Sequence, residues 1–375
     1  MKQYTDLKLG ILGGGQLGRM MIAASEKLGL TYHVLDPDRE AACQGISQFT
    51  KGSYADFDQV LSFGRQVDCL TTEIEHVNTE ALRLLESQIP VYPQADVLAM
   101  IQDKGLQKKF YAKHRFPTAD FVLLENETSL HAYPYLFPAV QKLRRHGYDG
   151  RGVISLDTPD DLSFSAPSVL EKRIEIANEI SVLTCRDQFG KMITYTPVEM
   201  IVDPHENMLT QLRSPATLSA AQSAECITLA REVNATLGIV GMLAIELMVD
   251  TSGGIWINEM APRPHNSGHH TIESASTSQF EQHIRAVIGA PIVDITWEKP
   301  AAMCNLLGGN RAGLAYWEGL EPILNTPNAY LHLYGKRYTK PHRKMGHLTV
   351  VADHIETAIA QLRTLSAGMY CNGRT

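Results

Sequence analysis

Two acidic residues face each other across a hairpin that the sequence predicts at residues 245–260. The segments IELMVD and IWINEM are separated by TSGG, which is a strong turn signal. A symmetric loop pairs Met248 with Ile257 and Glu246 with Glu259, so both carboxylates lie on one face of the sheet. Two carboxylates about 4 Å apart repel by about 4 kcal/mol at an effective dielectric constant of about 20. Mg²⁺ bridging phosphates would offset that repulsion; a shared proton and a solvated hairpin are the alternatives.

A polar run, NEMAPRPHNSGHH, follows directly from the second acid and spans residues 258–270. An arginine beside a magnesium site binds oxyanions bidentately, so Arg263 is a candidate for holding an anionic substrate, with His265 beside it. The histidines also raise the possibility of zinc, but they lack the H-E-x-x-H pattern and thiolate ligands that zinc prefers. A surface loop of the same composition is the simplest alternative.

A glycine-rich turn follows the first apolar run of the chain. Gly13, Gly15 and Gly18 fit the pattern G-x-G-x-x-G, and Asp36 follows the next apolar run. Together they resemble the fingerprint of a dinucleotide site, in which glycines admit the pyrophosphate and an acid binds a ribose hydroxyl. The same glycines could serve only to pack a helix on a strand. The turn therefore leaves a nicotinamide-dependent oxidoreductase and a plain scaffold both open.

Composition narrows the class of protein. The chain has 375 residues, 44% of them hydrophobic, and a net charge of −7, which gives no general attraction to nucleic acid or to an anionic membrane. No apolar run reaches the length of about 18 residues that a membrane span requires. The six cysteines form no C-x-x-C pair, so we expect buried, reduced thiols and a cytoplasmic protein. These features favour a small-molecule enzyme.

The elements that position these residues follow from the hydrophobic pattern. Short apolar runs alternate with helical patterns over the first hundred residues, which is typical of a parallel α/β sheet. Prolines 90 and 93 indicate the end of this unit, and a helix is expected over residues 95–114. The remaining expected strands and helices are strands at residues 7–12, 32–35, 69–74, 302–307, 330–334 and 347–351, a helix from about residue 16 and a helix after residue 353.

Several motifs, in order, resemble one enzyme family over almost the whole chain. They are GGGQLGRM, HGYDGRG, the linker EKRI, the glutamate pair, APRPHNSGHHTIE and HLYGKRYTKPHRKMGHLTV. This combination is similar to the 5-(carboxyamino)imidazole ribonucleotide synthases of purine biosynthesis, which are ATP-grasp ligases. The resemblance implies α/β and α+β architecture: a Rossmann-like pre-ATP-grasp domain (1–100), an ATP-grasp domain (101–292) and a small β-rich C-terminal domain (293–375). It also implies a homodimer.

The resemblance assigns residues to ATP and Mg²⁺. Glu246 and Glu259 match the metal ligands, and Glu179 matches the acid that holds the ribose of ATP. The positions implied for ATP are Lys104, Lys142, Gly147, Tyr148, Asp149, Gly150, Arg151, Gly152, Glu171, Lys172, Arg173, Ile174, Glu179, Asn258 and Glu259. Three glycines in the loop 147–152 suit a lid over the phosphates, and a simple hairpin turn is the alternative.

The resemblance also implies the substrates and a mechanism. ATP would phosphorylate bicarbonate to carboxyphosphate, and the amine of aminoimidazole ribonucleotide would then be carboxylated. The positions implied for substrate are Gln16, Leu17, Glu75, Tyr148, Arg151, Arg263, His265, Lys336 and Arg343. Asp149, Arg263 and Lys336 are the expected catalytic residues, with Asp149 handling the amine proton. A related ATP-grasp ligase with another acceptor, and a non-catalytic nucleotide-binding module, are the remaining alternatives.

Overall fold

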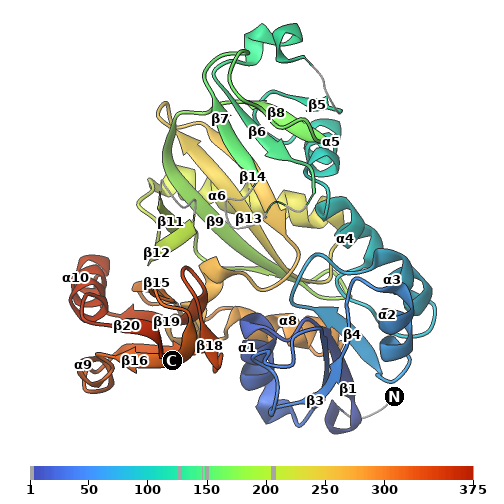
Figure 1. Cartoon of the computed structure of the whole chain (residues 1–375), viewed down its shortest axis with the longest axis vertical. Helices are drawn as coiled ribbons and strands as arrows, with labels where there is room; N and C mark the ends of the chain where they lie inside the picture. Colours follow the sequence, from blue (N-terminus) through green and yellow to red (C-terminus); the bar gives the residue numbers. More distant parts are fainter. Residues whose placement is uncertain (1–3, 126–128, 146, 148–151, 204–207, 375) are drawn as a thin grey trace.

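The computed structural model describes residues 4–374 except 126–128, 146, 148–151 and 204–207 (Figure 1). The predicted loop residues Tyr148, Asp149, Gly150 and Arg151 therefore lie outside the described residues. All six cysteines are buried and free, as the sequence predicts. Among the helices of the described residues, none is both long and apolar enough to cross a bilayer.

The N-terminal unit is built around a parallel sheet with the strand order β3-β2-β1-β4. Its strands are β1 (Lys8–Leu12), β2 (Thr31–Asp36), β3 (Gln48–Lys51) and β4 (Cys69–Thr72), and its helices are α1 (Gln16–Ser25), α2 (Phe57–Gly64) and α3 (Thr79–Glu86). Four of the five residues of β1 are buried because helices cover both faces of a parallel sheet. The predicted alternation of strands and helices is confirmed, and the carboxyl ends of the strands meet at one edge.

The prediction of one continuous helix over residues 95–114 is wrong. Two helices occupy the region, α4 (Ala95–Ile101) and α5 (Lys104–His114), and the chain changes direction between them. Asp103 causes the break because its carboxylate accepts hydrogen bonds from the amides of Gly105, at 2.8 Å, and Leu106, at 3.2 Å. This N-cap makes Lys104 the first residue of α5.

The central unit has two antiparallel layers that Figure 1 shows one above the other. The smaller sheet has the order β5-β8-β6-β7, with β5 (Phe121–Leu124), β6 (Ala139–Leu143), β7 (Val153–Leu156) and β8 (Ser168–Lys172). The larger sheet contains β9 (Ile176–Arg186), β10 (Met192–Thr194), β11 (Val198–Asp203), β12 (Met208–Ser214), β13 (Gly241–Asp250) and β14 (Ile255–Ala261). Helix α6 (Ala220–Leu237) covers β9 and β13 through an apolar core that includes Val233, Leu243 and Ile245.

The C-terminal strands extend the larger sheet, because β12 pairs with β15 (Ala301–Leu307). The extension continues through β19 (Lys344–Val351) to β17 (Ala329–Leu333), and helix α10 (Ile355–Ser366) packs against it. A separate sheet has the order β18-β16-β20, with β16 (Gly313–Glu318), β18 (Tyr338–Thr339) and β20 (Tyr370–Arg374). The strands expected in this region and the helix after residue 353 are confirmed.

Helix α8 (Gln279–Val287) joins the N-terminal unit to the larger sheet. Its residues Phe280, Ile284 and Val287 are buried in the core of the N-terminal unit. On the same helix, the ring of His283 lies 2.8 Å from the hydroxyl of Thr71 and accepts the amide of Met242 at 3.0 Å. The remaining short helices are α7 (Thr271–Ser274), α9 (Glu321–Leu324) and the 3-10 turns Tyr4–Asp6, Glu26–Leu28, Leu130–Ala132, Pro134–Leu136 and Asn266–Gly268. The domain boundaries at residues 100 and 292 stay a prediction.

Candidate active site

The hairpin of β13 and β14 brings the two predicted metal ligands together. Glu246 pairs directly with Glu259, as predicted, but Met248 faces Trp256 and not Ile257. The predicted partner of Met248 is wrong because Asn258 is an extra residue on β14 and shifts the register by one. A bulge of this kind redirects side chains, and here it places Asn258 and Glu259 in contact with lysines from other elements.

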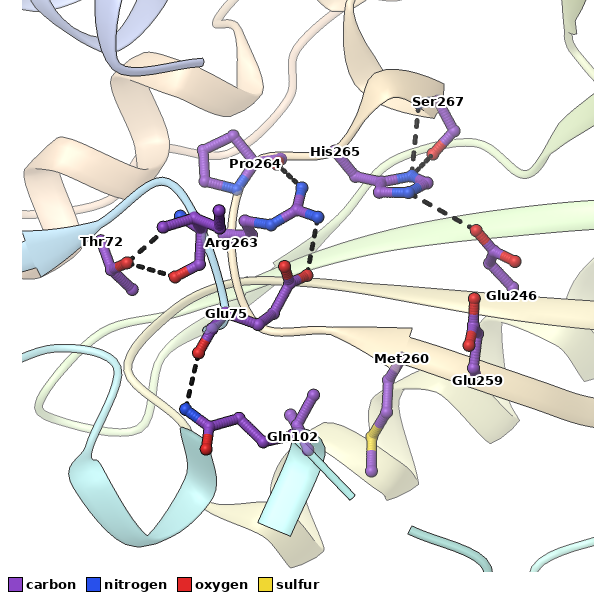
Figure 2. Close-up of polar contacts among 12 residues, drawn as sticks. Thr72, Glu75, Gln102, Glu246, Glu259, Met260, Arg263, Pro264, His265 and Ser267 are labelled. Atoms are coloured by element: carbon purple, nitrogen blue, oxygen red, sulfur yellow. Dashed lines mark hydrogen bonds and ion pairs between the residues drawn. The ribbon is translucent and has the colours of Figure 1, made fainter. Parts of the chain in front are cut away.

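Cationic and polar side chains contact the carboxylate pair, and Figure 2 shows the ring of His265 pointing toward Glu246. The ammonium group of Lys104 forms an ion pair with Glu259, and Nε2 of His265 lies 3.4 Å from Oε1 of Glu246. Burial raises the pKa of the Glu246 carboxyl, and nearby Lys104 opposes that shift. Burial also lowers the pKa of Lys104 to about 8. Two carboxylates on one sheet face match the oxygen ligands that a hard divalent cation requires, so the donor set fits Mg²⁺.

His265 is held as a neutral ring with a defined tautomer. Burial lowers its pKa to about 3, so the ring is uncharged at neutral pH. Its Nδ1 accepts the amide of Ser267 at 3.3 Å and lies 2.8 Å from the Ser267 hydroxyl. Because Nδ1 is an acceptor, Nε2 carries the hydrogen and donates toward Glu246. His265 therefore orients one carboxylate of the pair without neutralising it.

The smaller sheet contributes Lys142, from β6. Its ammonium group donates to Oδ1 of Asn258 at 2.7 Å and lies 3.3 Å from Oε2 of Glu171. Burial raises the pKa of Glu179, on β9, to about 7, and the negative charge of Glu246 adds to the shift. Lys142, Glu179 and Asn258 therefore lie beside the carboxylate pair, and their role in a nucleotide site stays a prediction.

The linker residues at the end of β8 and directly after it divide into two groups. Glu171 is buried, whereas Lys172 is exposed and Arg173 pairs with the exposed carboxylate of Asp157 at 2.8 Å. The side chains of Lys172 and Arg173 are therefore not brought to the carboxylate pair. For Lys172 and Arg173 only the backbone remains a candidate for nucleotide contact, whereas the buried side chain of Glu171 lies beside Lys142.

A second group of predicted residues meets at the carboxyl edge of the N-terminal sheet. Arg263 forms an ion pair with Glu75 at 2.6 Å, and Figure 2 shows the two side chains pointing toward each other. Glu75 is also fixed through its backbone, because the side chain of Gln102 donates to its carbonyl oxygen at 2.7 Å. The Nε atom of Arg263 is buried and has no hydrogen-bond partner among the described residues. Arg263 therefore keeps a donor for a further anionic group.

The C-terminal unit brings two of the predicted substrate residues, Lys336 and Arg343, to the N-terminal unit. The ammonium group of Lys336 donates to the side chain of Gln16 at 2.9 Å and to the carbonyl of Lys344 at 2.7 Å. Arg343 donates to the carbonyl of Tyr338 at 2.6 Å and lies 3.9 Å from Asp38. The side chain of Leu17 is buried in the core, so only its backbone amide is available to a ligand.

Glu73 is a residue of this region that sequence reasoning missed. Its carboxylate accepts the amides of Gly15, at 2.5 Å, and Gly18, at 2.7 Å. A Cβ atom added at Gly13 or Gly15 would lie within 2.6 Å of the Glu73 side chain, so these glycines make room for a carboxylate. The sequence signal that could have identified Glu73 is its position immediately after β4, at the carboxyl edge of the sheet.

The glycine turn is thus occupied by the chain itself. Asp36 accepts the amide of Gly14 at 2.7 Å and that of Asp38 at 2.7 Å, and Glu73 takes two further amides. In a dinucleotide site these amides would face pyrophosphate, and the acid after the second strand would bind ribose. The dinucleotide interpretation of the turn is therefore wrong, and the scaffold interpretation holds.

Family comparisons cover the three parts of the chain. Residues 7–102 match the ribonucleotide synthetase preATP-grasp domain, residues 109–280 the ATP-grasp domain, and residues 301–361 the phosphoribosylaminoimidazole carboxylase C-terminal domain. The N5-carboxyaminoimidazole ribonucleotide synthase of Pseudomonas aeruginosa is 33% identical over 370 residues, which cover 96% of this chain and 99% of that protein.

Longer relatives and solved structures extend the comparison. The chain spans 36% of a bifunctional purine synthesis protein of Dictyostelium discoideum and 65% of a phosphoribosylaminoimidazole carboxylase of Schizosaccharomyces pombe, each 34% identical. The N5-carboxyaminoimidazole ribonucleotide synthetase of Thermotoga maritima has a TM-score of 0.89 and 33% identity, covering 98% of this chain and 100% of that one. An Aspergillus clavatus synthase solved with ADP and 5-aminoimidazole ribonucleotide has a TM-score of 0.86 and 29% identity, covering 97% and 98%.

Proposed function

The chain belongs to the N5-carboxyaminoimidazole ribonucleotide synthase family, and on that premise we propose that it uses ATP and bicarbonate to carboxylate the amine of 5-aminoimidazole ribonucleotide. The observation that carries the proposal is the pairing of Glu246 with Glu259 beside Lys104 and Lys142, next to a second cationic group at Arg263. A carboxylate pair among lysines suits a metal-bound polyphosphate, and the arginine suits a smaller anion.

The nucleotide half of the site has defined roles. Lys104 and Lys142 would neutralise the phosphates of ATP, and Glu179 would accept hydrogen bonds from its ribose. Mg²⁺ held by Glu246 and Glu259 would supply charge neutralisation at the transferring phosphoryl group. Lys104 must leave Glu259 to reach a phosphate, so the ion pair of this structure would open when the nucleotide binds. The glycine-loop residues 147–152 are proposed as the cover of the phosphates.

The acceptor half of the site lies between the N-terminal and C-terminal units. Lys336 and Arg343, with the backbone amides of Gln16 and Leu17, would hold the 5′-phosphate, because Lys336 already contacts Gln16. Glu75 would contact the aminoimidazole. An anion bound by Arg263 would compete with Glu75 for the guanidinium group. Binding of that anion would therefore release Glu75, which could then contact the aminoimidazole.

The chemistry balances with these groups. A bicarbonate oxygen attacks the γ-phosphorus of ATP, ADP leaves, and carboxyphosphate forms. Arg263 would hold this anion while water is excluded, and the ribonucleotide amine then attacks its carbon as phosphate departs. The amine loses one proton in this step, and we propose Asp149 or the departing phosphate as its acceptor. Magnesium dependence, a homodimer and a cytoplasmic location complete the proposal.

A phosphate-release assay tests the function. ATP, Mg²⁺ and bicarbonate are supplied with and without 5-aminoimidazole ribonucleotide, and we expect the ribonucleotide to stimulate phosphate release. Formate with glycinamide ribonucleotide replaces bicarbonate and the aminoimidazole in a parallel reaction. Stimulation by that second pair, with none by the first, would show that the acceptor is wrong.

A further inference from the structure

A fully buried lysine lies one helical turn from Lys104 and has no role in the chemistry above. Lys108, on α5, is 2% exposed, whereas the next residue, Lys109, is exposed. Lys104 and Lys108 are four residues apart and therefore share one face of the helix. A buried ammonium group is costly unless an opposite charge and hydrogen bonds compensate it. Its partners therefore indicate why this position holds a lysine.

Lys108 connects three elements around the nucleotide site. Its ammonium group lies 2.9 Å from Oε2 of Glu171, at the end of β8, and donates to the hydroxyl of Thr118 at 2.6 Å. Thr118 in turn donates to the carbonyl of Ile257, which directly precedes the bulged Asn258. Lys108 thus ties α5 and the linker strand β8 to the hairpin that carries the carboxylate pair.

Glu171 is the centre of this network. Two ammonium groups approach the same oxygen, Oε2, and Lys108 at 2.9 Å is nearer than Lys142 at 3.3 Å. The other oxygen, Oε1, is buried and accepts no hydrogen bond from the described part of the chain. Burial alone would raise the pKa of Glu171, but Lys142 and Lys108 reverse the shift, so the carboxylate stays charged. A charged, buried acceptor oxygen is thereby held ready for a donor.

Lys108 also affects which partner the ammonium group of Lys142 points toward. Because Lys108 is the nearer counter-ion of Glu171, Lys142 makes its shorter contact with Asn258, at 2.7 Å, beside Glu259. Without Lys108, Lys142 would be the one remaining cation of the described residues that pairs with the buried carboxylate of Glu171. It would then be drawn away from the hairpin where the phosphates are proposed to bind.

We propose that Lys108 is a positioning residue of the nucleotide site, which fixes Oε2 of Glu171 so that Oε1 faces an amino group of the nucleotide base and Lys142 faces the phosphates. The proposal rests on the proposed function, because Glu171 is one of the positions that the family resemblance implies for ATP. An acceptor oxygen favours adenine, whose 6-amino group is a donor, over a purine that lacks this group. Lys108 itself touches neither base nor phosphate.

Calorimetric binding of two nucleotides tests this role without requiring turnover. ATP and purine riboside triphosphate, which lacks the 6-amino group, are titrated into the wild type, K108M, K108R and the exposed matched control K109M. Since a hydrogen bond to a charged group contributes about 1.5–3 kcal/mol, we expect K108M to lose about tenfold to a hundredfold in preference for ATP. K108R should keep most of the preference, and K109M all of it.

Kinetics separate positioning from a general loss of structure. K108M should raise the KM for ATP and leave the KM for 5-aminoimidazole ribonucleotide unchanged. A folded K108M with the wild-type preference for ATP, or with equal losses for both nucleotides, would overturn the proposal. If K108M does not fold, the charge-balanced pair K108M/E171Q takes its place, and wild-type preference in that variant would equally overturn it. Failure of the proposed function would appear in a separate measurement. In that case 5-aminoimidazole ribonucleotide would not stimulate phosphate release by the wild-type protein.

Discussion

The glycine turn of the N-terminal unit and the acidic hairpin of the central unit both contain the residue types of a ligand site, but the glycine amides of the turn are already taken, whereas the acids of the hairpin remain open to a cation. In the turn, the amides of Gly14, Gly15 and Gly18 are taken by Asp36 and Glu73. In the hairpin, two carboxylates oppose each other and are balanced by lysines from other elements.

The difference between these regions lies in where the compensating charge comes from. The donors of the turn are backbone amides, which a carboxylate from the neighbouring strand satisfies permanently. The carboxylates of the hairpin are balanced by flexible lysine side chains, which can move to a phosphate when a cation replaces them. A motif therefore indicates a ligand site only when its polar groups are not already matched within the fold.

The largest expected effect concerns the hairpin. Glu259→Gln should reduce turnover by about a thousandfold, because it removes one carboxylate of the metal pair and the counter-ion of Lys104. Ribonucleotide-stimulated phosphate release measures the loss, and circular dichroism checks the fold. The exposed Glu318→Gln is the matched control. If E259Q turned over at the wild-type rate, the carboxylate pair of the hairpin would not be the catalytic metal site.

A substitution in the glycine turn should lower the stability of the protein. Gly15→Ala places a Cβ atom 2.5 Å from Oε1 of Glu73, so we expect a loss of about 1–3 kcal/mol in the free energy of unfolding. Urea denaturation measures it. Gly368→Ala is the control because a Cβ there meets nothing within 4 Å. An unchanged stability together with weaker ATP binding would mean that the turn is a nucleotide site, contrary to the comparison.

A smaller effect is expected at the junction of the N-terminal and C-terminal units. Arg343→Ala should raise the KM for the ribonucleotide about tenfold, since one charge-assisted contact to phosphate is lost, and leave the KM for ATP unchanged. Steady-state kinetics with each substrate varied in turn provide the measurement. Lys340→Ala, an exposed cation in the same loop, is the control. Equal rises in both KM values would show that Arg343 acts on the structure and not on the phosphate.

The last expected effect is gradual, because it is a change in the pH dependence of stability. Burial lowers the pKa of His283 to about 3, below the usual histidine value of about 6.5, so below about pH 6.5 the unfolded chain binds a proton that the folded chain does not bind. Stability therefore falls as the pH drops through this window. His283→Gln should reduce the slope by about 1.4 kcal/mol per pH unit between about pH 5.5 and 4. Urea denaturation across this range measures it, and the exposed His354→Gln should leave the slope unchanged.

Local sequence signals predicted most elements and the pairing of Glu246 with Glu259. Apolar alternation and the TSGG turn are short-range features, so the hairpin could be read directly. Asp103 shows a local signal that was outweighed, because the apolar pattern continues across it while its side chain caps α5. The bulge at Asn258 had no such signal. It coincides with contacts from residues distant in sequence: Lys142 reaches Asn258, and Gln107 accepts the amide of Met260 at 3.2 Å.

By itself the sequence determined the residue types of the site, the hairpin that carries its acids and the family motifs, because these depend on neighbours along the chain. Tertiary structure alone decided that Glu73 fills the glycine turn, that Arg263 faces Glu75 and that Lys108 neutralises Glu171. Each of these contacts joins residues that are far apart in the sequence. Their charges interact only over a few ångströms, a distance that packing sets and that spacing along the chain does not encode.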